Sequence, residues 1–297
     1  MSELITTPSG FDVRVTRDIA YADRGGTALE LDLYRPEVAG EVPTVVYLHG
    51  GGFAMGRRTD LPERLVGVAQ RGVAVASASY RLVDKAIYPA QLEDVRDAVR
   101  WVRRHGGSHG LDTTRVGIWG ASAGAALAML TGFAPDPDGS AADASVQAVV
   151  SWFGPADLTF DGEKAQPTPG LPVPESIIEF AQRDGMVMPP DPTFYARLVG
   201  VEKEEEGQEA LLQASPLTHV NGQGPPLLLM HGDSDAMLSL DHSRWLFDKV
   251  REDDGDVSLL ILAGANHEDE MFHRGDALGA VAAFLHERLS PARPTIR

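Results

Sequence analysis

The sequence predicts an α/β protein whose mostly parallel sheet is covered by helices on both faces. Continuous apolar runs at residues 44–48 and 73–77 are typical of strands buried on both sides. Such runs alternate with amphipathic stretches up to residue 289, the pattern of repeated strand–helix–strand units. With 297 residues, 43% of them apolar, the chain can build a sizeable core, and we expect one domain over residues 1–297.

Each element follows from its local pattern. Segments 12–20 and 27–34 alternate apolar and polar residues on either side of two glycines, which predicts a half-exposed hairpin at the edge of the sheet. Apolar runs predict further strands at 44–48, 73–77, 115–119, 146–152, 226–230 and 257–262. Amphipathic or small-residue stretches predict helices at 61–71, 89–104, 123–130, 240–250 and 276–289. The expected sheet therefore has eight strands.

Segment 157–215 interrupts this alternation. It is rich in proline, contains an amphipathic patch at 177–181, and carries an acidic run at 202–206 that we interpret as a solvated helix face. Long irregular segments in compact domains are usually functional. We expect an insertion over the carboxyl edge of the sheet, a cap that shapes a pocket.

Composition excludes several functions. The absence of cysteine rules out disulfides, thiolate nucleophiles and cysteine-based metal sites. The net charge of −17 repels nucleic acids and anionic membranes, so neither is an expected partner. There is no signal-peptide pattern at the N-terminus and no apolar run long enough to span a bilayer, which predicts a cytoplasmic protein.

The strongest chemical signal is Gly-Ala-Ser-Ala-Gly at residues 120–124, where a predicted strand meets a predicted helix. Small neighbours allow the sharp turn that holds a serine hydroxyl clear of the sheet, at the positive end of the helix. The pattern Gly-x-Ser-x-Gly alone is common by chance, but its position between a predicted strand and a predicted helix is the one that a nucleophile needs. We therefore predict Ser122 as the nucleophile.

A glycine-rich stretch, His-Gly-Gly-Gly-Phe at 49–53, follows the buried strand at 44–48. Its uncovered backbone N–H groups could stabilise an oxyanion, and the expected donors are those of Gly51, Gly52 and Ala123. We expect His49 to brace the loop and not to act as a base. The alternative is an ordinary glycine-rich strand end.

A serine nucleophile needs a base, and the base needs an orienting carboxylate. Asp235 follows the strand predicted at 226–230, and His267 follows the one at 257–262. The order serine, aspartate, histidine, with each residue past a strand's carboxyl end, is that of an α/β-hydrolase. Asp235 is favoured over Asp233, and His273 is the only serious rival to His267.

Beyond these motifs, five stretches strengthen a family resemblance: residues 80–82, 88–101, 111–120, 152–157 and 214–218. From about Leu29 to the C-terminus, the chain resembles α/β-hydrolase serine esterases of the hormone-sensitive-lipase-like and feruloyl/acetyl-xylan-esterase-like types. The resemblance implies the α/β-hydrolase fold, Asp235 as the acid, His267 as the base, and esters with short acyl groups as substrates. No nucleotide-binding glycine motif and no zinc-helix motif is present, so no cofactor and no metal are expected.

The chain departs from this resemblance directly after His267. Similar sequences usually carry glycine there, whereas this chain has Glu268, Asp269 and Glu270. Nearby carboxylates favour the imidazolium form, so we predict a raised pKa for His267 and a more alkaline activity optimum.

The remaining expectations concern less specific residues. The pocket is expected to be lined by segment 157–215 together with Phe53, Met55, Tyr80 and Trp152. Four histidines lie in polar contexts and are predicted at the surface: His105, His109, His242 and His286.

The sequence thus predicts a carboxylesterase that acts through an acyl-enzyme on a small-molecule ester; a homodimer is left open. A formamidase, an acyl-transferring tailoring enzyme and a catalytically silent binding protein remain alternatives. The complete set of serine, aspartate, histidine and glycines argues against the silent form.

Overall fold

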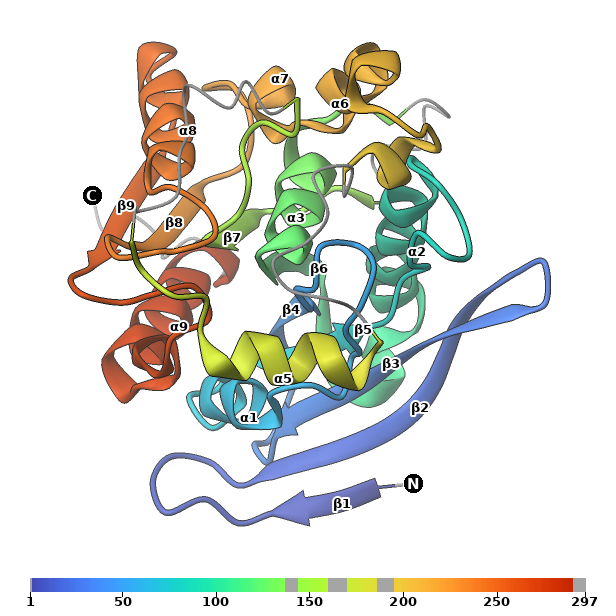
Figure 1. Cartoon of the computed structure of the whole chain (residues 1–297). Helices are drawn as coiled ribbons and strands as arrows, with labels where there is room; N and C mark the ends of the chain where they lie inside the picture. The colour runs from blue at the N-terminus through green and yellow to red at the C-terminus, as the bar shows by residue number, and fades with distance from the viewer. Residues whose placement is uncertain (1, 137–143, 160–169, 186–194, 291–297) are drawn as a thin grey trace.

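The computed structural model describes residues 2–136, 144–159, 170–185 and 195–290 (Figure 1). Within them, nine strands form one sheet in the order β1-β2-β3-β5-β4-β6-β7-β8-β9. The strands are β1 (Ser2–Ile5), β2 (Val13–Arg24), β3 (Thr27–Pro36), β4 (Val42–Leu48), β5 (Ala74–Ala78), β6 (Leu111–Ala121), β7 (Ala148–Trp152), β8 (Leu227–Gly232) and β9 (Val257–Leu262). All neighbours from β5 to β9 pair in parallel, and the N-terminal pairs are antiparallel.

The expected count of eight strands is wrong, because the N-terminal tail adds β1 to the edge of the hairpin. Ser2 pairs with Thr16, and Ile5 pairs with Val13. The side chains of β1 are almost all exposed, so the strand is held by backbone hydrogen bonds and carries no apolar alternation.

Helices cover the two faces of the sheet separately. The apolar residues of α1 (Pro62–Ala69) and α9 (Gly275–Leu289) pack into one core. Those of α2 (Ala90–His105), α3 (Ala123–Phe133) and α8 (Asp241–Glu252) pack into the core on the other face. No helix in the described ranges combines the length and apolar character needed to cross a bilayer.

The expected insertion at 157–215 lies between β7 and β8, although residues 160–169 and 186–194 fall outside the described part. Its elements are α5 (Glu175–Arg183), η2 (Ala196–Val199), η3 (Glu204–Glu206) and α6 (Gln208–Ala214), followed by α7 (Pro216–His219). In Figure 1, α5 crosses the front of the molecule beside α1. It buries Ile177 and Ala181 on its inner face.

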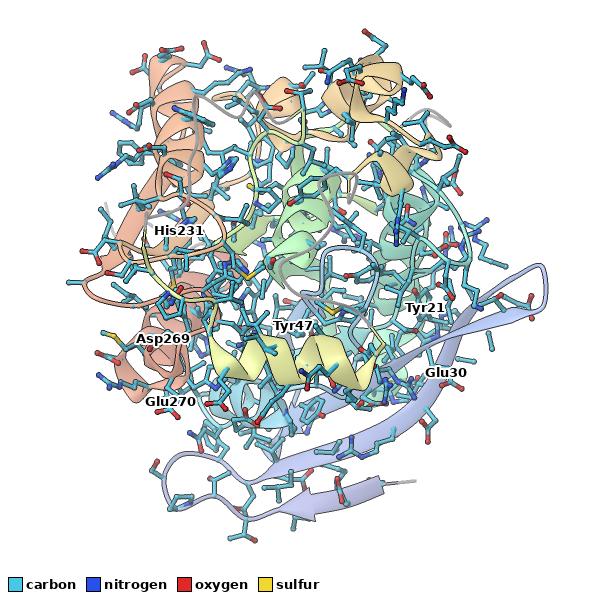
Figure 2. All side chains as sticks on the ribbon, viewed as in Figure 1. Tyr21, Glu30, Tyr47, His231, Asp269 and Glu270 are labelled. Atoms are coloured by element: carbon cyan, nitrogen blue, oxygen red, sulfur yellow. The ribbon has the colours of Figure 1, made fainter. Side chains whose placement is uncertain are left out.

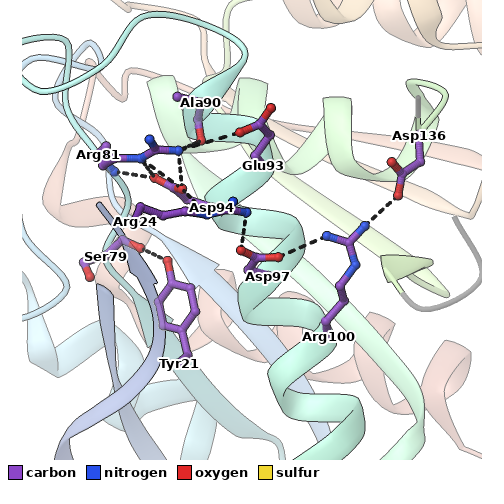
Figure 3. A network of polar contacts seen from close by, with 10 residues as sticks. All are labelled: Tyr21, Arg24, Ser79, Arg81, Ala90, Glu93, Asp94, Asp97, Arg100 and Asp136. Carbon is purple, nitrogen blue, oxygen red and sulfur yellow. Dashed lines mark hydrogen bonds and ion pairs between the residues drawn. The ribbon is translucent and has the colours of Figure 1, made fainter. Parts of the chain in front are cut away.

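A polar network ties the N-terminal hairpin to α2 (Figure 3). Asp94 is fully buried and accepts two hydrogen bonds from the Arg81 guanidinium, at 2.7 Å from Nη2 and 2.8 Å from Nε. Arg24 of β2 contacts both Asp94 and Asp97, and Tyr21 donates to the backbone oxygen of Ser79. The buried carboxylate thereby joins a strand, a helix and the segment after β5.

Candidate active site

Ser122 occupies a strained turn between β6 and α3. Its backbone has φ 52° and ψ −122°, and its N–H donates to the Trp152 oxygen at 2.9 Å. The neighbouring glycines are required by close packing, because a Cβ at Gly120 would lie 2.1 Å from the oxygen of Gly124, and a Cβ at Gly124 would lie 2.3 Å from that of Leu48. The turn therefore presses the start of α3 against the end of β4.

The structure brings the three predicted residues Ser122, His267 and Asp235 into one hydrogen-bonded chain. His267 Nε2 lies 3.1 Å from Ser122 Oγ, and His267 Nδ1 lies 2.7 Å from Asp235 Oδ2. The imidazole is 3% exposed and the carboxylate 1% exposed. An imidazole held in this way can accept the serine proton while the carboxylate fixes its tautomer.

The Asp235 carboxylate is surrounded by donors. Its Oδ1 accepts the backbone N–H groups of Met237 and Leu238, both at 2.8 Å, and its Oδ2 also lies 3.3 Å from Nε2 of His231. Burial alone would raise the pKa of Asp235, but His267 and His231 hold it well below its ordinary value. The group is therefore an anion throughout the neutral range.

The His267 side chain experiences opposing effects. Burial lowers its pKa, but the charge and hydrogen bond of Asp235, followed by the charge of Glu268, raise the pKa above its ordinary value. The direction agrees with the sequence-based expectation, but the rise in pKa comes chiefly from Asp235, and among the three acidic residues after His267 it is Glu268 that adds to it. The ring of Phe153 packs edge-on against the imidazole at 4.6 Å between centroids.

The glycine-rich loop lies directly against Ser122. A Cβ at Gly50 would come within 3.2 Å of Ser122 Cβ, and Gly51 and Gly52 adopt φ angles of 113° and 58° that favour glycine. Ala123 is the first residue of α3, so its N–H has no acceptor within the helix. Gly50 and Ala123 thus lie next to Ser122, and Gly51 and Gly52 follow Gly50 directly along the chain.

His49 is buried beside this loop. It stacks on Tyr80 at 4.4 Å, its Nδ1 lies 2.8 Å from the Gly50 oxygen, and the Tyr80 hydroxyl donates to the His49 oxygen. Burial lowers the pKa of His49, which keeps the ring neutral. These contacts agree with a bracing role.

Two expectations about other side chains are wrong. Trp152 was predicted to line the pocket but is fully buried among the aromatic residues under α1 and α9, because its strand position directs it to that face. His242 was predicted at the surface but is 2% exposed, since its Nδ1 accepts the N–H of Ala156 from the segment after β7. Phe53 and Tyr80, at 2% and 4% exposed, also lie in the core.

Asp233 and His273, the alternatives to Asp235 and His267, form contacts elsewhere. Asp233 Oδ1 accepts the N–H of Gly264, and His273 Nε2 accepts a hydrogen bond from Arg64 at 2.6 Å. Glu268 also turns toward Arg64, with which it forms an ion pair. Sequence reasoning missed Arg64, although its position four residues before Val68 places it on the apolar face of α1.

The described part of segment 157–215 contacts both sides of the site. Near the base, the Asn266 side chain donates to the Pro172 oxygen at 3.2 Å and accepts the N–H of His267. At the other end of α5, Asp184 accepts the N–H of Gly56, which follows the glycine-rich loop, at 3.0 Å. Helix α5 is therefore fastened to the segments that carry the base and the glycines.

Within the described ranges, no group of three or more histidine, aspartate and glutamate side chains is arranged to hold a metal ion. The chemistry that the site supports with its own residues is nucleophilic attack by Ser122.

Known proteins share both sequence and fold with this chain. The probable carboxylic ester hydrolase LipM of Mycobacterium tuberculosis is 26% identical over 244 residues, which cover 79% of this chain and 51% of LipM. The chain spans about half the length of the curated relatives it matches.

A truncated carbohydrate esterase from gut microbiota superposes with a TM-score of 0.77 at 21% identity, covering 96% of this chain and 99% of that one. The butyrate-bound esterase Est2 of Thermogutta terrifontis has a TM-score of 0.69 at 24% identity, covering 96% and 97%. The expected α/β-hydrolase fold is confirmed. The BD-FAE family matches residues 31–250, more than half of the chain. The chain therefore belongs to the BD-FAE family.

Proposed function

We propose that this protein hydrolyses carboxylic esters through an acyl-enzyme on Ser122. The observation that carries the proposal is the continuous chain from Ser122 Oγ to His267 Nε2 at 3.1 Å and from His267 Nδ1 to Asp235 at 2.7 Å. The names of LipM and of the structural neighbours, all of which denote ester hydrolases, support the same chemistry.

Each residue has a defined task in this mechanism. As Ser122 Oγ bonds to the ester carbonyl carbon, its proton passes to His267 Nε2, and the carbonyl oxygen becomes an oxyanion that the N–H groups of Gly51, Gly52 and Ala123 stabilise. Collapse of this intermediate expels the alcohol, which takes the proton from His267. Water then attacks the acyl-enzyme with His267 again as the base, releasing the acid and restoring Ser122.

We also propose that segment 157–215 is the cap that shapes the pocket and restricts it to short acyl groups. Its contacts at Asn266 and Asp184 place α5 beside both the base and the glycine-rich loop. A short acyl preference is supported by the butyrate in the Est2 structure. The partner is then a small-molecule ester. The cytoplasmic location stays a prediction, and a homodimer stays open.

The first experiment measures initial rates on p-nitrophenyl esters from acetate to long chains, for wild type and Ser122→Ala. Ser234→Ala is the matched control, since this hydroxyl lies on the Asp235 loop and donates only to Asp233 among the described contacts. We expect saturable turnover that peaks at short chains, is lost in Ser122→Ala by at least about a thousandfold, and persists in the control.

Turnover that survives in Ser122→Ala would refute the nucleophile. If folded wild type cleaves no ester, labelling of Ser122 by a fluorophosphonate distinguishes the remaining alternatives. A labelled serine directs the search to formamide substrates and to acyl transfer with added alcohol or amine acceptors, whereas an unlabelled one favours a silent binding protein.

A further inference from the structure

Arg64 is a fully buried cation beneath the proposed active site. It lies on α1 among aromatic residues, with its guanidinium 5.0 Å from the Trp152 ring and donating to the Tyr47 hydroxyl at 2.8 Å. Tyr47 is 1% exposed and lies close to α5, near the centre of the view in Figure 2. A buried charge in such surroundings requires a close counter-charge.

Glu268 supplies that charge from the residue directly after His267. Its carboxylate pairs with Arg64 Nη2, which also donates to His273 Nε2 at 2.6 Å. The backbone of Glu268 has φ 57°, in the left-handed region that is unfavourable for a residue with a Cβ. The ion pair holds a turn that glycine would otherwise favour, and it joins positions 204 residues apart.

We propose that the buried Arg64 and the partly exposed Glu268 form a clamp that positions His267 against Ser122. Arg64 lies on α1, the first helix after the glycine-rich loop, and Glu268 lies on the loop that carries His267. The ion pair therefore joins the segment after the glycine-rich loop to the segment that carries the proposed base. Arg64 and Glu268 are positioning residues, because neither touches the reacting atoms. The inference rests on the proposed role of His267.

The charges around His267 predict a signature that a purely structural contact would not produce. Asp235 faces the imidazole from the segment after β8, and Glu268 adds a second negative charge. Behind Glu268 lie Arg64 and the His273 ring, whose Nδ1 lies 3.5 Å from Glu63 on α1. Removing the negative member of the clamp should therefore favour neutral His267, and removing the positive member should favour its imidazolium.

The test compares Glu268→Gln, Arg64→Gln and the double variant by kcat/KM against pH. We expect the acidic limb of the kcat/KM profile to move down by roughly half a pH unit in Glu268→Gln and up in Arg64→Gln. In the double variant the limb should return close to its wild-type position. Glu270→Gln is the matched control, an exposed glutamate two residues further on (Figure 2), and should leave the limb unchanged. Limbs that coincide in all variants would overturn the clamp.

Glu268→Ala and Glu268→Gly test positioning by a second route. Because both leave the buried Arg64 guanidinium without its carboxylate, kinetics are compared only for variants that circular dichroism shows to be folded. Both remove the anchor, but only alanine keeps the unfavourable φ. We expect kcat to fall about tenfold in Glu268→Ala with KM within about twofold, and to fall less in Glu268→Gly. Unchanged kcat in both variants, or a change in melting temperature alone, would contradict the proposal.

Titration of the His267 imidazole by NMR, in protein labelled at histidine, separates this inference from the proposed function. The opposite shifts in Glu268→Gln and Arg64→Gln should appear there even if His267 is not the base of an esterase. Absence of both shifts would refute the clamp whatever the enzyme's activity.

Discussion

His231 Nε2 lies 3.3 Å from Asp235 Oδ2, the same oxygen that meets His267 Nδ1 at 2.7 Å. The His231 ring is fully buried, with Nε2 also 3.0 Å from the oxygen of Leu238 and Nδ1 2.8 Å from the hydroxyl of Ser243. Because a carbonyl oxygen only accepts, Nε2 carries a proton, and in the neutral ring Nδ1 accepts from Ser243. His231 therefore donates toward the same Asp235 oxygen as His267.

Replacing His231 by leucine should lower kcat about tenfold with little change in KM, because Asp235 loses a donor that orients it. The His231→Gln variant retains an amide donor and should lose less activity than His231→Leu. Steady-state kinetics on folded variants checks this order, with His286→Gln as a control on a partly buried histidine bonded to the Arg71 oxygen. Equal activity of wild type and the leucine variant would exclude a positioning role.

Much of the fold is predictable because its signals are local. Runs 44–48 and 73–77 predict β4 and β5, since strands buried on both faces are apolar at nearly every position. Ser122, Asp235 and His267 are likewise found from strand ends, because parallel strands bring their carboxyl ends to one edge of the sheet. Their hydrogen-bonded contact follows from this arrangement, while their catalytic roles stay predictions.

What the sequence does not reveal depends on distant partners. The strand β1 has no apolar alternation and exists through pairing with β2. His242 lies on a helix rich in charges, yet a contact with Ala156, 86 residues away, buries it. From the sequence, Glu268 is one of three acidic residues that follow His267, and its ion pair with Arg64 is visible only in the structure. Pattern and spacing carry no information about such pairs.

Under the proposed mechanism, the raised pKa of His267 sets the pH dependence of activity. Only the neutral imidazole can act as a base, so kcat/KM should fall as pH drops through a pKa above the ordinary value of about 6.5. The free energy of unfolding depends on pH in the opposite direction. Protonated His267 stabilises the fold fully below its unfolded-state pKa, and this stabilisation is lost as pH rises through its raised folded-state pKa. An acidic limb at or below the ordinary histidine pKa would refute this prediction.

Gly124→Ala should impair activity more than stability. The added Cβ would lie 2.3 Å from the Leu48 oxygen and 2.4 Å from the His49 oxygen, so the strand end that leads into the glycine-rich loop must move away from Ser122. We expect kcat to fall about a hundredfold, as when an oxyanion donor is lost, and stability to fall by about 1–3 kcal/mol. Gly107→Ala, where the new Cβ would meet nothing within 4 Å, is the control. Wild-type kcat in Gly124→Ala would show that the loop tolerates the displacement.

Asp94→Ala should destabilise the fold while sparing the chemistry. It leaves the Arg81 guanidinium without its fully buried partner in the network of Figure 3, far along the chain from Ser122, Asp235 and His267. We expect a loss of about 3 kcal/mol in the free energy of unfolding, against about 1 kcal/mol for Asp97→Ala, whose carboxylate is 21% exposed. Urea denaturation measures both, and equal losses would contradict the importance of burial.

Asp184→Ala tests whether segment 157–215 caps the site. Asp184 holds the end of α5 to the Gly56 N–H at 3.0 Å and to Arg57 at 2.7 Å, and Gly56 packs so closely on the glycine-rich loop that a Cβ there would lie 2.5 Å from the Gly50 oxygen. Releasing this contact should let α5 move away from the loop and relax the selection against longer acyl groups. We expect the ratio of kcat/KM for hexanoate to that for acetate to rise about fivefold. Glu179→Gln, on the exposed side of the same helix, should leave the ratio unchanged. A ratio that is the same in Asp184→Ala and wild type would mean that α5 does not limit the acyl pocket.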